Sequence, residues 1–255
     1  MLLMFPSSLT LVAGLAIALA AGVVRGFAGF GFSALCVAGL SLFVSPSGLV
    51  PAVLALEILA SASLLRGSMR DADRRWLIWL FAGGLLFTPI GMVALALVPP
   101  DLARLLVGLA LLITAIVLRA GLASTLSSST AWPATAGVAA GLLNGLAASG
   151  GVAAAMIMTA TGMKAATLRA TMIAYLLVAG CYALICAAVV SGASGVSLLG
   201  RETLNWMLLL GPAMFAGIWI GRRSFGGADP AAYRRFVLNL LIVISALTVA
   251  RALWL

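Results

Sequence analysis

Gly22-Val23-Val24-Arg25-Gly26-Phe27-Ala28-Gly29-Phe30-Gly31 places a cluster of glycines and one full positive charge inside a hydrophobic stretch. A related segment, Gly141-Leu142-Leu143-Asn144-Gly145-Leu146-Ala147-Ala148-Ser149-Gly150-Gly151, occurs in the second half of the chain. When the two segments are aligned at their first glycine, Arg25 falls on Asn144. Two matched interruptions of hydrophobic segments are typical of a binding site formed between two repeats in a membrane.

The composition predicts an all-α integral membrane protein. The chain has 255 residues, of which 64% are hydrophobic and 8% are charged, and its mean hydropathy is +1.23. A soluble domain of this size needs a charged surface, and the apolar stretches are too long and unbroken for the strands of a membrane barrel. The net charge of +9 comes from basic residues between apolar segments. That placement orients a membrane protein in the bilayer and argues against a nucleic-acid partner.

The chemistry-bearing residues argue against an enzyme, a metal site or a cofactor. The chain has no histidine, and its three cysteines, Cys36, Cys181 and Cys186, all lie within apolar segments. Small core residues are the simplest interpretation of such thiols. The single lysine, Lys164, is not part of a phosphate-binding loop, so ATP hydrolysis by that route is excluded.

Hydrophobic blocks and breakers predict two repeats joined by a linker at 123–131. The N-terminal repeat (1–122) and the C-terminal repeat (132–255) each begin with a long block that contains a glycine segment. The first of these blocks, 9–44, splits into pieces 9–24 and 32–44 of about 24 and 20 Å, too short for a bilayer core of about 30 Å. We therefore expect hairpins at 9–44 and 132–162. The predicted spanning helices are 46–65, 76–98, 102–118, 170–191, 203–221 and 236–254.

The distribution of basic residues favours the hairpins. If every block crossed the membrane once, seven basic residues would lie on each side. With hairpins in the first and fifth blocks, only Arg104, Arg201 and Arg251 lie on one side, and the other eleven basic residues outside the hairpins lie opposite. Cytoplasmic loops are enriched in basic residues, so the second arrangement is preferred. It places both termini outside and gives the two repeats opposite orientations in the membrane.

Three motifs are similar to those of the TauE/SafE family of sulfite exporters and related anion permeases. They are Asn144-Gly145, Ser149-Gly150-Gly151 and Leu168-Arg169-Ala170-Thr171, and the resemblance extends over nearly the whole chain. It implies a multi-pass protein of the bacterial inner membrane that moves small sulfur-containing or carboxylate anions without hydrolysing ATP. Phe30 and Phe32 depart from the small or polar residues at the matching positions 149 and 151, which suits a substrate with an organic tail.

The breaks themselves are candidate anion sites. A break frees backbone N–H groups at the start of the next half-helix, where the helix dipole is positive. Gly29, Gly31, Gly150 and Gly151 would let an anion approach this backbone, and Ser149 adds a hydroxyl donor. The alternative is that these glycines serve close helix packing.

Arg25 is the strongest individual candidate, since its guanidinium group can bind a sulfonate or carboxylate with two hydrogen bonds. A charge deep in a membrane faces a cavity or a partner. The alternatives for Arg25 are an ion pair with Glu57, the only acidic residue well inside an apolar block, and snorkelling of its side chain to an interface. Glu57 could instead couple transport to protons. Asn144 and Arg169 are further candidates, with capping of the break and membrane orientation as their respective alternatives.

Gly26 and its aligned partner Gly145 complete the predicted substrate-binding set. The expected function is a secondary transporter, an exporter of an organosulfonate, sulfite or related oxyanion, working by alternating access. A carboxylate permease of the same fold and an anion channel are the alternatives. The expected partners are the small anion and the lipid bilayer, and the sequence leaves a homo-oligomer open.

Overall fold

The computed structural model describes residues 8–65, 69–120, 131–195, 198–224 and 230–254, and over these ranges it contains helices and no strands. The all-α prediction is confirmed. Residues 123–130 of the predicted linker lie outside the described residues. The elements are α1 (Ser8–Ala28), α2 (Phe32–Leu40), α3 (Pro46–Leu65), η1 (Met69–Asp71), α4 (Arg74–Leu97), α5 (Pro100–Arg119), α6 (Ala131–Ala147), α7 (Gly150–Ala160), α8 (Ala165–Ser194), α9 (Arg201–Ser224) and α10 (Pro230–Trp254).

Six of the described helices are long and apolar enough to cross a membrane: α1, α3, α4, α5, α8 and α9. The structure therefore agrees with a multi-pass membrane protein. Two further apolar stretches of the described residues are shorter: Gly150–Thr159 in α7 and Leu238–Trp254 in α10. Helix α8 has 30 residues and extends beyond the predicted span 170–191 at both ends.

The first hydrophobic block is interrupted after Ala28, and the chain then reverses direction. Gly29 and Gly31 have φ angles of 84° and 94°, in the left-handed region that glycine adopts without strain. Helix α2 returns along α1, because Gly39 near its end packs against Ile17 and Leu40 packs against Gly14. The two helices thus form an antiparallel hairpin.

The predicted first arm, 9–24, is too short. Helix α1 has 21 residues, about 31 Å at 1.5 Å per residue, and it includes Arg25. The helix continues through Gly22 and Gly26 because both glycines lie against the backbone of α9, at Gly217 and Ile218. Close helix packing in a membrane offsets the weak intrinsic helix propensity of glycine. The break therefore occupies residues 29–31 and not the whole stretch 25–31.

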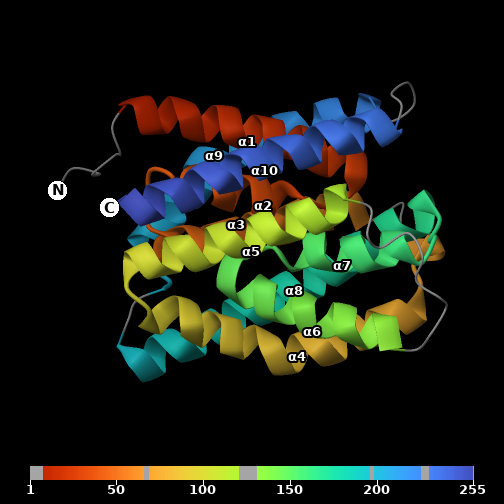
Figure 1. The fold of residues 1–255 in the computed structure, drawn as a ribbon, viewed down its shortest axis with the longest axis horizontal. Coiled ribbons are helices and arrows are strands. Elements are labelled where there is room, and N and C mark those ends of the chain that lie inside the picture. Colours follow the sequence, from red (N-terminus) through yellow and green to blue (C-terminus); the bar gives the residue numbers. More distant parts are fainter. Residues whose placement is uncertain (1–7, 66–68, 121–130, 196–197, 225–229, 255) are drawn as a thin grey trace.

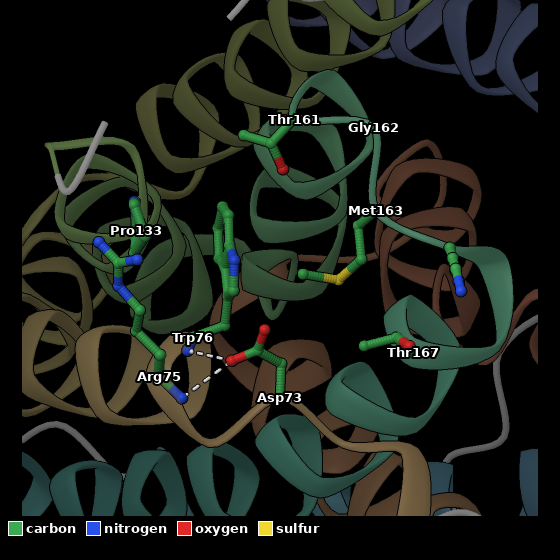
Figure 2. Close-up of a pocket in the computed structure, with 9 residues that line it drawn as sticks. Asp73, Arg75, Trp76, Pro133, Thr161, Gly162, Met163 and Thr167 are labelled. Atoms are coloured by element: carbon green, nitrogen blue, oxygen red, sulfur yellow. Dashed lines mark hydrogen bonds between the residues drawn. The ribbon is translucent and has the colours of Figure 1, made fainter. Parts of the chain in front are cut away.

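The second block is interrupted at residues 148 and 149, between α6 and α7. Ala148 has a φ angle of 50°, the only positive φ among the described non-glycine residues. Pro133 near the start of α6 lines the same pocket as Thr161, just after α7, so α7 returns along α6 (Figure 2). This block too is an antiparallel hairpin.

Helices of one predicted half pack against helices of the other. Helix α1 packs against α9, and the corresponding first helix of the second half, α6, packs against α4. Figure 1 shows α1 and α9 in one layer and α4 and α6 in the opposite layer. In both pairs glycines bring the backbones together, Gly22 with Gly217 in one and Gly83 with Gly137 in the other. The two pairs are thus packed in the same way, and a duplicated origin of the two halves stays a prediction.

Two hydrophobic clusters make up the core. One lies within α4, α6, α7 and α8, and the other extends over α1, α2, α3, α5, α9 and α10 and includes neighbouring parts of α4, α6, α7 and α8. Helices α3 and α8 pack together between the two layers, with Gly180 against Ile58. Helix α1 begins and α10 ends at the same end of the bundle (Figure 1). Residues at both breaks, Phe30 and Ala148, lie in or against this core, and α8 contacts both breaks.

Candidate functional site

The side chain of Arg25 ties the first break to α3. It is fully buried, and its Nη2 lies 3.0 Å from the Glu57 carboxylate oxygen Oε1. The same nitrogen donates a hydrogen bond of 2.6 Å to the Ser61 hydroxyl, while Nη1 donates to the carbonyl of Gly29 in the break. One guanidinium group thus contacts two positions on α3 and one in the break.

This buried ion pair is not fully hydrogen-bonded. Among the described residues, the Nε of Arg25 and both carboxylate oxygens of Glu57 have no hydrogen-bond partner, although Oε1 contacts the guanidinium electrostatically. A buried pair compensates its lost hydration only when additional hydrogen bonds satisfy both groups. The Nε of Arg25 is therefore a donor from which a ligand oxygen can accept a hydrogen bond, whereas the two Glu57 oxygens are themselves acceptors.

The start of α2 offers backbone donors next to this pair. Gly31 is the N-cap and makes no side-chain capping hydrogen bond, and the first amide bonded back to it is that of Leu35. The amides of Phe32, Ser33 and Ala34 therefore precede the first intrahelical bond. All three residues are buried. The positive end of α2 and the guanidinium group of Arg25 flank the same three-residue break.

The second break is neutral and closely packed. Asn144 is buried, and its Nδ2 donates a 3.2 Å hydrogen bond to the carbonyl of Ala179 on α8. Ser149 is the N-cap of α7 without a side-chain capping bond, and its hydroxyl donates to the Leu143 carbonyl at 3.4 Å. Gly150 lies against the backbone of Ala140. The break is held by hydrogen bonds to carbonyl groups and contains no charge.

Gly26 and Gly145 occupy equivalent packing positions. A Cβ at Gly26 would clash with the carbonyl of Ile218 on α9, and a Cβ at Gly145 would clash with the carbonyl of Thr88 on α4. Both glycines therefore serve close packing of one helix against another, which was the alternative to a role in binding. Gly151 similarly lies against the side chain of Leu176. A contact between these three glycines and a substrate stays a prediction.

Arg169 belongs to the first break. It lies in the second turn of α8, is half-buried, and donates a 3.0 Å hydrogen bond from Nη2 to the Gly26 carbonyl. Gly29 lies directly against its side chain, where a Cβ would meet the Arg169 Cγ at 2.6 Å. The sequence pointed to Arg169 from a motif in the second half of the chain. The fold brings it to the glycine break of the first half.

The predicted residues form two groups and not one. The first consists of Arg25, Gly29, Gly31, Glu57 and Arg169, and the second of Asn144, Ser149, Gly150 and Gly151. Helix α8 contacts both groups, at Arg169 and at Ala179. These positions are ten residues apart and therefore about 15 Å apart along the helix axis. The two breaks are thus offset along α8.

Ser61 is a site residue that the sequence reasoning missed. It follows Glu57 by four residues on α3, so both side chains lie on one helix face. A hydroxyl four residues from the only acidic residue deep in an apolar block was the signal that could have identified it.

A pocket of about 370 Å³ opens away from both breaks, where the starts of α4 and α6 meet the connection between α7 and α8. In Figure 2, Asp73 accepts hydrogen bonds of 2.9 and 3.1 Å from the amides of Arg75 and Trp76 and so caps α4. Lys164 adds a second positive charge to the lining. No residue of either break lines this pocket.

Comparison with known proteins identifies one family. A family model described as Sulfite exporter TauE/SafE matches residues 14–248, nearly the whole chain. No curated protein and no solved structure matches it. The matched range includes both helix breaks and the ion pair.

Proposed function

The chain belongs to the sulfite exporter TauE/SafE family, and on that premise we propose that it is a secondary transporter that exports a small anion, an organosulfonate, sulfite or related oxyanion, across the bacterial inner membrane. The observation that carries this proposal is the buried guanidinium group of Arg25 beside the uncapped start of α2. A fixed positive charge and free backbone donors at one break are what a desolvated oxyanion requires.

In the proposed bound state, the anion takes over part of the contact between Arg25 and Glu57. An oxyanion has several acceptor oxygens, so it can accept from the guanidinium fork and from the amides at the start of α2 together. Glu57 then competes with the anion for Arg25. Because of this competition, Glu57 neutralises the charge of Arg25 when no anion is bound. It also limits the affinity of the site for the anion, so that the anion can be released.

The packing suggests which parts would move during alternating access. The backbone contacts between α1 and α9, and between α4 and α6, are too close to slide without clashes. We therefore expect α1 to move with α9 and α4 to move with α6. The moving bodies would each contain helices from both sequence halves, and they would rock against each other where α3 packs on α8.

The apolar surroundings of the first break favour an anion with an organic part. Phe32 is fully buried at the start of α2, and Phe30 packs against both hydrophobic clusters.

Export is also favourable electrically, because an anion leaving a negative interior gains about 2.3 kcal/mol per charge at 100 mV. A carboxylate could use the same donors, so a carboxylate permease is the second candidate. Burial of both breaks speaks against an open anion channel.

A panel of anions tests this proposal and names the substrate. Purified protein is heated with methanesulfonate, sulfoacetate, sulfite, sulfate or acetate, and the unfolding temperature is recorded for wild type and for Arg25→Gln. We expect at least one anion to raise the unfolding temperature of wild type and to have no effect on the variant. Equal protection of both proteins by every anion would contradict binding at Arg25.

A further inference from the structure

Three helix ends meet at Gly26, in the last two turns of α1. The Gly26 carbonyl accepts the hydrogen bond from Arg169 at the start of α8. On another side of the same residue, a Cβ at Gly26 would lie 3.0 Å from the backbone nitrogen of Arg222 in the last turn of α9. Arg169 and Arg222 are therefore brought together over a single glycine, next to the break.

These contacts arrange three arginines by depth. Arg25 is fully buried, Arg169 is half-buried, and Arg222 is exposed. Each neighbouring pair interacts through its charges, Arg25 with Arg169 and Arg169 with Arg222. A series of positive charges thus runs from the surface to the buried ion pair beside the first break.

Capping of a helix end explains only part of this arrangement. Arg25 and Arg169 donate to carbonyl groups at the end of α1, as basic side chains near a helix C-terminus commonly do. Arg222 meets Gly26 through its backbone, and its side chain is exposed. Like charges within interaction range repel each other, and an anion placed between them relieves that repulsion. A divalent anion relieves it more than a monovalent one.

We propose that Arg222, Arg169 and Arg25 form the entry path of the anion, and that Arg222 at its mouth recruits the anion and favours divalent over monovalent substrates. This inference rests on the proposed transport function. It names a residue outside both glycine motifs, and it assigns entry to the end of the bundle where α1 and α9 end. An anion would pass from Arg222 to Arg169 and then to Arg25, in the order of increasing burial.

Arg223 provides a matched control. It is the next residue on α9, it is also exposed, and its guanidinium group stacks on the ring of Trp219 at 3.6 Å from the ring centroid. Substituting either arginine by glutamine removes one charge from the same helix turn. Only Arg222 lies at Gly26, so a local role and a general effect of surface charge predict different results.

The experiment measures initial efflux from proteoliposomes that contain the full chain. Sulfoacetate, with two negative charges, and methanesulfonate, with one, are loaded over a range of concentrations for wild type, Arg222→Gln and Arg223→Gln. We expect Arg222→Gln to raise the half-saturating concentration of sulfoacetate about fivefold. Because the Coulomb energy scales with charge, that of methanesulfonate should rise about twofold. Arg223→Gln should leave both values within the error of wild type.

Two results would overturn the proposal. Equal shifts for the two probes would mean that Arg222 does not select for charge, and equal effects of Arg222→Gln and Arg223→Gln would mean that only net surface charge matters. The difference between probes should also shrink at 1 M salt, where charges are screened beyond about 3 Å. If wild type transports neither probe, the proposed transport of sulfonates is contradicted. Wild type alone shows this result, so it can be told apart from a failure of the proposed entry path.

Discussion

The two helix breaks lie at matching places in the sequence and are chemically different. The first contains a buried full charge, two glycines with positive φ, and an ion pair that lacks part of its hydrogen bonds. The second has a neutral amide in place of the arginine, and an alanine, Ala148, takes the left-handed conformation. If the halves arose by duplication, one break has kept or acquired a charge while the other has become neutral and closely packed.

The difference between the breaks predicts different roles for them in the proposed site. In the proposed site, the charged group at the first break would give the anion its one strong contact, and the neutral second break, which is offset along α8, would add no second desolvated charge. Both breaks keep an uncapped helix start. We therefore expect substitutions at the first break to affect binding strongly, and those at the second to act mainly through packing.

The largest effect is expected from separating the buried ion pair. Glu57→Leu leaves Arg25 buried without its counter-charge and should lower the free energy of unfolding by about 3–5 kcal/mol. The double variant Arg25→Leu with Glu57→Leu should recover most of this loss. Thermal or denaturant unfolding in detergent measures the stability of the single and the double variant. A single variant as stable as wild type would show that the two side chains do not interact as described.

A smaller effect is expected where glycines pack helix against helix, and it should be similar in the two halves. Gly26→Ala and Gly145→Ala each place a methyl group against a carbonyl of the facing helix and should destabilise by about 1–3 kcal/mol. Gly192→Ala on α8 is the control, because nothing lies within 4 Å of its Cβ position.

This control should be neutral or stabilising by up to about 1 kcal/mol, since alanine is the better helix former. Unfolding measurements on the three variants sharpen the comparison of the two packed pairs. A loss at Gly26 with none at Gly145 would show that α1–α9 and α4–α6 are not equivalent.

The smallest effects concern the backbone of the breaks. Gly31→Ala forces alanine into a left-handed conformation and should cost about 1 kcal/mol or slightly more. Ala148→Gly removes the corresponding strain from the second break and should be neutral or stabilising by a few tenths of a kcal/mol, after the extra chain entropy of glycine is included. Equilibrium unfolding measures whether each variant has a lower or a higher free energy of unfolding than wild type. Stabilisation by Gly31→Ala would contradict the described break.

Much of the architecture was predictable because the relevant signals are local. Length and hydropathy predicted a helical membrane protein, and the glycine segments predicted both interruptions. The extent of α1 was not predictable, since glycine's weak helix propensity at 22 and 26 is overruled by the approach of α9, almost 200 residues away in sequence. A local pattern cannot report contacts made at that separation.

The site was predictable only in part for the same reason. Arg25 and Glu57 stood out as charges in apolar segments, and the structure pairs them. Ser61 could be found only from its spacing of four residues after Glu57, and Arg222 looked like one of many basic residues that orient the chain. Ser61 is reached by the long Arg25 side chain, and Arg222 lies at Gly26 because α9 packs on α1.

Binding of the anion at Arg25 is tested most directly by counterflow of a labelled substrate from the panel in proteoliposomes, comparing Arg25→Gln with Arg104→Gln. Arg104 is also a largely buried arginine with an ion pair, to Asp101 at 2.7 Å, but it donates to Ser41 at the opposite end of α2 from the first break. We predict that Arg25→Gln abolishes counterflow while folded protein remains, and that Arg104→Gln retains it. Counterflow at wild-type rates in Arg25→Gln would contradict an anion site at the first helix break.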